Sequence, residues 1–70
     1  MSYYENVMEK VKKINDLAGK NLIKKIAYSQ KKDQIRLEVT GLRWTYPCEM
    51  AMYYLKGYYD LLKQALEVGL

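Results

Sequence analysis

The chain has 70 residues, a formal net charge of +4, no histidine and a single cysteine, Cys48. A domain of this size buries only about 60% of the surface that its unfolded chain exposes, so it needs unusually good packing or a partner subunit. An intrachain disulfide needs two cysteines, and a structural zinc site needs four ligands drawn mainly from cysteine and histidine, so neither can stabilise the fold.

The composition is that of one folded domain over residues 1–70, because half of the residues are apolar and 29% are charged. The N-terminal sequence lacks a basic segment followed by an apolar one, and no apolar run approaches the roughly 20 residues that cross a bilayer. A lone thiol fits a reducing compartment. We therefore expect a cytoplasmic protein with no membrane partner and no cofactor.

The first helix is predicted to begin at Ser2, because Ser2 and Glu5 have the spacing of a capping box. Apolar residues at helical spacing continue to Ala18, and Gly19 supplies the left-handed residue that commonly closes a helix.

A β-hairpin is predicted next. Residues 22–30 fit either a helix or a strand, but residues 34–40 alternate apolar and polar side chains as a strand does, and the polar residues 31–33 suit a hairpin loop. At Gly41 the apolar positions change phase, which indicates a β-bulge or bend, or the start of a short third strand.

The last helix is predicted from Pro47 to Val68, with Thr45 or Tyr46 as its cap. The chain is therefore an α+β domain of order α-β-β-α, with the hairpin packed against two helices. The apolar side chains of the last helix spread over roughly 200° of its circumference, whereas a surface helix needs a stripe of about 100° or somewhat more. This excess favours a homodimer; the alternative is that some apolar residues stay partly exposed.

Catalysis has little support in the sequence, and we expect no enzyme. Without histidine, acid–base chemistry near neutral pH needs another group with a strongly shifted pKa. Cys48 near a helix N-terminus could favour the thiolate, but it lacks a base partner and is better interpreted as a packed thiol. The four glycines are far apart, so there is no phosphate-binding loop.

Nucleic-acid binding has a local basic patch in its favour, because residues 20–43 hold seven basic residues against two acidic ones. Interleaved Tyr28, Trp44 and Tyr46 could stack on bases while the basic side chains contact phosphates. A lysine-rich loop that merely stays solvated is an equally simple explanation, and Trp44 fits a core position. The candidate contacts to DNA or RNA are Lys24, Lys25, Lys31, Lys32, Arg36 and Arg43.

Protein binding is the leading hypothesis. Methionine and tyrosine are enriched at interfaces, and both are frequent in the last helix. We expect a non-catalytic protein-interaction module, such as an inhibitor, adaptor or subunit, that forms a homodimer and binds an unidentified protein. The candidate interface residues are Met52, Leu55, Tyr58, Tyr59, Leu62 and Leu66.

Overall fold

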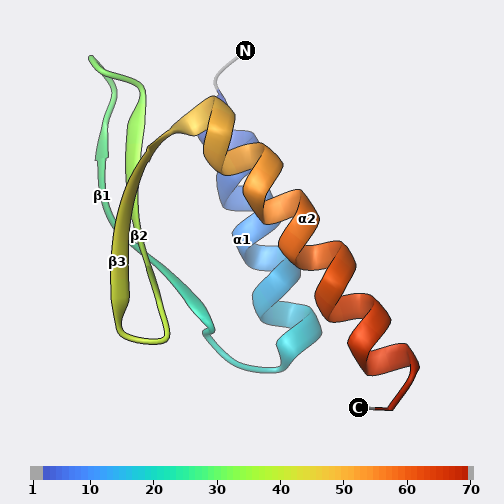
Figure 1. Ribbon diagram of the computed structural model, residues 1–70. Helices are drawn as coiled ribbons and strands as arrows, with labels where there is room; N and C mark the ends of the chain where they lie inside the picture. The colour runs from blue at the N-terminus through green and yellow to red at the C-terminus, as the bar shows by residue number, and fades with distance from the viewer. Residues whose placement is uncertain (1–2, 70) are drawn as a thin grey trace.

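The computed structural model describes residues 3–69. It contains two helices and three strands in the order α-β-β-β-α (Figure 1): α1 (Tyr3–Ala18), β1 (Ile23–Ser29), β2 (Gln34–Val39), β3 (Leu42–Pro47) and α2 (Cys48–Glu67). The predicted α+β class and the hairpin are confirmed, and residues 22–30 form a strand and not a helix. Of the alternatives left open at Gly41, the third strand is the one that forms, so the two-strand order extends to α-β-β-β-α.

Helix α1 follows the predicted periodicity. Val7, Val11 and Ile14 are buried, and their spacing places them on one face of the helix. Gly19 has a φ of +73° and donates its N–H to the carbonyl of Asn15 at 2.9 Å, as expected of a glycine that ends a helix. The predicted capping box at Ser2 lies outside the described residues.

The three strands form an antiparallel sheet of order β1-β2-β3. Gly41 does not mark a bulge: Thr40 and Gly41 form a two-residue turn, with φ values of +51° and +84° that match a type I′ hairpin. The irregularity lies in β1, where the register shifts between Lys25 and Ala27. Ile26 is therefore the extra residue of a β-bulge.

Alternation along the strands gives the sheet one apolar and one polar face. Ile35 and Leu37 are buried against the helices, whereas Arg36 between them is exposed on the opposite face. Both helices lie on the apolar side of the sheet, and the polar side is uncovered (Figure 1). The core is formed by Val7, Val11, Ile14, Ile23, Ile35, Leu37, Cys48, Ala51 and Leu55.

Helix α2 follows β3 without a loop. Pro47 ends the strand and is also the N-cap, without a side-chain cap, so the expected capping by Thr45 or Tyr46 is wrong. The Cys48 N–H instead donates to the Asp33 carbonyl at 2.8 Å. From this junction α2 runs beside α1 in the same direction (Figure 1). Neither helix, over residues 3–69, has the length and apolar character needed to cross a bilayer.

Candidate interaction surfaces

An apolar groove of about 420 Å³ lies between the sheet and α2. Leu37, Val39, Trp44 and Tyr46 line it from the sheet, and the α2 side is formed by Ala51, Tyr54, Leu55 and Tyr58, with Ile23 and Thr40 completing the lining. We call this the aromatic groove.

One end of the groove lies near the junction of β3 and α2. There the rings of Tyr46 and Tyr54 meet edge to face, with centroids 5.0 Å apart. Toward the Thr40–Gly41 turn the sheet diverges from α2 (Figure 1). The Trp44 side chain is left 47% exposed and that of Tyr54 52% exposed. Trp44 is therefore neither a core residue nor a platform on the basic face.

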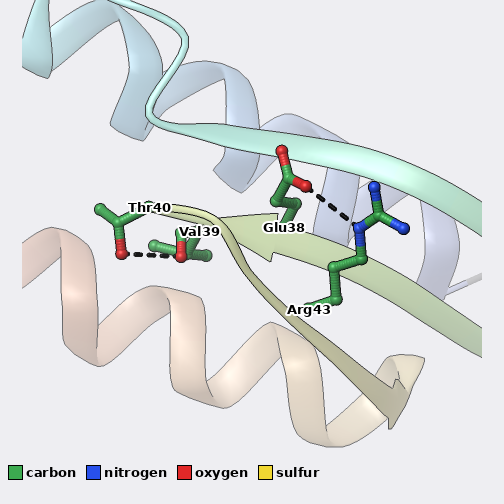
Figure 2. A network of polar contacts seen from close by, with 4 residues as sticks. All are labelled: Glu38, Val39, Thr40 and Arg43. Atoms are coloured by element: carbon green, nitrogen blue, oxygen red, sulfur yellow. Dashed lines mark hydrogen bonds and ion pairs between the residues drawn. The ribbon is translucent and has the colours of Figure 1, made fainter.

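The lining of the groove contains no charged residue. Its polar side-chain atoms are the hydroxyls of three tyrosines and of Thr40 and the indole N–H of Trp44, and the Thr40 hydroxyl already donates to the Val39 carbonyl at 2.7 Å (Figure 2). Specific small-molecule sites usually add a few fixed polar groups that orient the ligand. The chemistry of this groove therefore suits apolar side chains better than a polar metabolite.

The six predicted interface residues of α2 divide into two groups. Leu55 is only 6% exposed and belongs to the protomer's own core, while Met52, Tyr59 and Leu62 pack partly buried against that core. Tyr58 and Leu66 are exposed.

The structure adds three residues to this surface that the sequence reasoning missed. They are Trp44, Tyr54 and Leu61, of which Leu61 is 69% exposed. Tyr54, Tyr58 and Leu61 follow one another at helical spacing beside the groove, and we call them the α2 stripe. The signal for the two α2 residues was already in the wide apolar arc, but the arc alone does not show which part of it α1 covers.

The six predicted nucleic-acid contacts also divide. Lys24, Arg36 and Arg43 lie on the uncovered face of the sheet, and Lys31 and Lys32 lie in the loop between β1 and β2. Lys25 does not join them, because its register partner is the buried Leu37 on the helix side. Its Nζ donates to the Tyr4 hydroxyl at 2.9 Å and lies 5.5 Å from the centroid of that ring.

Two of the basic side chains on the uncovered face are hydrogen-bonded to polar neighbours. Arg43 Nε donates to Glu38 Oε1 at 3.1 Å (Figure 2), which partly neutralises the patch. Arg36 Nε donates to the Thr45 hydroxyl at 3.0 Å.

The aromatic residues proposed to stack on bases lie on the other side of the sheet. Tyr28 and Tyr46 both pair with Ile35, and Trp44 pairs with Leu37, so all three side chains share the helix face. The basic face and the aromatic rings therefore cannot contact one single strand laid across the sheet.

Cys48 is buried at the junction of β3 and α2. Burial raises the pKa of its thiol from 9.0 to about 11, and a hydrogen bond to Asp33 and the negative charge of Asp33 act in the same direction. The group is thus a protonated, packed thiol at neutral pH and not an activated nucleophile.

Among residues 3–69, no three His, Cys, Asp or Glu side chains are grouped so that they could hold a metal ion. A second hollow, of about 610 Å³, lies between α1 and α2, and basic and acidic residues both line it. Comparison with protein-family models, curated proteins and solved structures finds no match for this chain.

Proposed function

We propose that this protein is a non-catalytic protein-interaction module that acts as a homodimer through the aromatic groove and the α2 stripe. The observation that carries the proposal is the apolar groove itself, with half-exposed Trp44 and Tyr54 at its mouth. Contiguous exposed apolar surface of this kind marks interaction sites on small domains.

A partner that covers this surface also addresses the limited core of the chain. Within residues 3–69, nine buried residues form the core, and a 70-residue domain is only marginally stabilised by its own packing. Removing apolar surface from water contributes roughly 25 cal/mol for each Å² buried. Tryptophan and tyrosine are also the residue types that most often dominate binding energies.

A second copy is a suitable partner because the α2 stripe and the aromatic groove lie on the same side of one protomer. Leu61 of the α2 stripe is 69% exposed, more than Trp44 and Tyr54 at the mouth of the groove. A two-fold axis brings the same patch of both copies together, so a single surface suffices for both partners.

The mass in solution tests the dimer. Sedimentation equilibrium at high micromolar concentration should give the mass of two chains, and Leu61→Asp should return it to that of one chain. Leu61 is the better position than Leu62, because Leu62 packs against the protomer's core and its substitution would also disturb the fold. Lys63→Asp, at an exposed position two residues after Leu61 and therefore on a different side of α2, is the control and should leave the dimer intact. A wild-type mass of one chain would reject the proposal.

A second candidate function is nucleic-acid binding by the uncovered face of the sheet. Lys24, Arg36 and Arg43 on that face and Lys31 and Lys32 in the adjoining loop support it. Because no aromatic ring of the sheet shares that face, contacts would be made to phosphates and would not depend on sequence.

Salt dependence tests this alternative. Binding to an oligonucleotide should weaken with salt, with a log–log slope that steepens by roughly 0.7 to 0.9 for each phosphate contacted. Replacing Lys31 and Lys32 by Gln should make that slope shallower, while replacing Lys12 and Lys13 of α1 should not. If micromolar protein fails to retard any oligonucleotide at low salt, the alternative is excluded.

A further inference from the structure

The two edges of the sheet are not alike. The β1 edge carries the bulge at Ile26 and the consecutive Lys24 and Lys25, which are features that discourage pairing with another strand. The β3 edge pairs with β2 in an unbroken register from Leu42 to Pro47, and its residues 42–45 are all exposed. The β3 edge is thus regular, with one charged residue, Arg43, and with its proline, Pro47, only at the end of the strand.

The hydrogen-bonding pattern of the hairpin fixes which backbone groups of β3 are available. In a two-residue hairpin the residues that flank the turn, Val39 and Leu42, exchange both backbone hydrogen bonds, and such pairs then recur at every second position. Leu42, Trp44 and Tyr46 therefore point their N–H and C=O groups toward β2. Arg43 and Thr45 point theirs outward, to the open edge.

We propose that two copies of this chain pair their β3 strands antiparallel, with the two-fold axis at Trp44, and so form one continuous six-stranded sheet. This inference rests on the proposed homodimer and specifies where its two subunits join. Main-chain pairing at an exposed sheet edge is an established mode of protein association.

The register follows from counting the outward groups. Residues that pair across two neighbouring strands have their side chains on the same face of the sheet. A two-fold axis perpendicular to the sheet therefore passes between the two copies of one β3 residue, and not between successive residues. With the axis at Trp44, Arg43 of each copy faces Thr45 of the other, and all outward N–H and C=O groups of both residues are paired. With the axis at Thr45, Arg43 faces Pro47, which has no N–H to donate.

Charge disfavours a third register. With the axis at Arg43, two arginines would lie directly opposite each other, and like charges in that position are destabilising. With the axis at Trp44, each Arg43 faces a neutral Thr45 and keeps its own Glu38 at 3.1 Å. The Trp44 register is therefore favoured by both hydrogen bonding and charge.

The same arrangement covers the aromatic groove. Trp44 lies on the helix face, so two copies of its indole meet across the axis, between the two grooves. Using 150–250 Å² for a fully buried aromatic side chain, the exposed parts of Trp44, Tyr54 and Tyr58 amount to roughly 300 Å². This is more than a third of the roughly 800 Å² that each partner buries in a standard interface, before Leu42, Leu61 and the strand edge are added.

A proline at the edge tests the strand pairing. Thr45→Pro removes an outward N–H and leaves the bonds to β2 in place, and proline is tolerated on edge strands. The variant should sediment as one chain under conditions where the wild type is a dimer. Thr45→Val loses the same hydroxyl but keeps the N–H, so it should remain a dimer. Circular dichroism shows whether each variant is folded.

A disulfide at the axis tests the register independently. Residues facing each other in a non-hydrogen-bonded pair have Cα atoms about 4.5 Å apart, within the range of a disulfide. In a Cys48→Ala background, Trp44→Cys should form an interchain disulfide with oxidised glutathione. Leu42→Cys, on the same strand and face, should not, because its two copies would lie about 13 Å apart.

The outcomes separate the two proposals. A wild-type protein that is a single chain in solution overturns the homodimer and this seam together. If the wild type is a dimer, Thr45→Pro stays a dimer and no disulfide forms at position 44, then the homodimer stands and the β3 seam is wrong. If Thr45→Pro fails to fold, the disulfide pair alone decides.

Discussion

Both helices cover the same face of the sheet, yet the part of that face under α1 is closed and the part under α2 is open. On the α1 side, Tyr4 stacks on Tyr28 with ring centroids 4.0 Å apart. The Asn15 side chain accepts from the Ile23 N–H at 2.9 Å and donates to the Ile23 carbonyl at 3.0 Å. On the α2 side, the aromatic groove separates the helix from the sheet.

The difference follows from how each helix is joined to its strand. Helix α1 reaches β1 through residues 19–22, and this loop leaves it free to lie along the sheet, where Asn15 and Tyr4 fasten it. Helix α2 continues directly from Pro47, so it meets the sheet at the end of β3 and the two diverge from there (Figure 1). Because no loop separates α2 from β3, the helix and the sheet diverge from their junction, and the aromatic groove lies between them.

The largest expected effect separates the closed core from the open stripe. Ile14 is fully buried, so Ile14→Ala should lower the free energy of unfolding by about 2–5 kcal/mol, which is most of the stability of a chain this short. Leu61→Ala should change the stability of the monomer by no more than about 0.5 kcal/mol. Urea unfolding at low protein concentration, where a dimer dissociates, measures both. Comparable losses would mean that α2 is fastened as firmly as α1.

The next effect concerns the junction at Cys48. Its folded-state pKa of about 11 lies above the value of 9.0 for an unfolded thiol, so the folded state favours the protonated form. The resulting stability is fully present below pH 9 and is lost as the pH rises through about 11, by roughly 2–3 kcal/mol. Alkaline pH also affects the rest of the chain, so the informative quantity is the difference between the wild type and Cys48→Ala. The loss of stability from pH 8.5 to 11 should be smaller in the variant; equal losses would show that the thiol is not the cause.

A smaller effect is expected at Asn15, which fastens the start of β1 to α1. Asn15→Ala leaves the partly buried N–H and C=O of Ile23 without these partners, which should cost about 1–3 kcal/mol in the free energy of unfolding. Lys12→Ala, an exposed position one turn earlier, is the control and should be nearly neutral. Amide hydrogen exchange should also accelerate more in β1 than in β3. Unchanged exchange in β1 would show that Asn15 does not hold this side closed.

Most of the fold could be predicted from the sequence because local patterns determine it. The apolar period of α1 predicts a helix, Gly19 predicts its end, and the alternation of residues 34–40 predicts a strand. The structure agrees with all three predictions. The β1 bulge could not be predicted, because the apolar spacing of residues 22–30 fits two kinds of element and the register of β1 depends on its partner strand.

The candidate site was harder to predict than the fold. An apolar arc shows that α2 has more apolar surface than one neighbour needs, but only the packing decides that Leu55 faces the core while Leu61 does not. Likewise, Lys25 and Lys24 are equivalent in sequence, and only the register places one on each face. Sequence periodicity identifies faces, whereas tertiary contacts decide which face remains uncovered.

The smallest expected effects compare the replacement of a tyrosine by leucine in α1 and in α2. Tyr4→Leu removes the stack on Tyr28, and Tyr54→Leu removes the edge-to-face contact with Tyr46. Aromatic pairs contribute about 0.5–1.5 kcal/mol beyond the area they bury. Tyr4→Leu should lower the stability of the monomer by about that much. It also removes the hydroxyl that accepts a hydrogen bond from the Lys25 ammonium.

Tyr54→Leu should cost the monomer less, because half of the Tyr54 side chain is already in water, and should instead weaken association in sedimentation experiments. Tyr3→Leu, an exposed tyrosine beside Tyr4, controls for the loss of a tyrosine as such. If the two sides differ as described, Tyr4→Leu lowers the urea midpoint of the monomer and Tyr54→Leu lowers the dimer affinity. The opposite pattern, with Tyr54→Leu the more destabilising change in the monomer, would mean that the α2 side is held together by its own contacts and does not need a second copy.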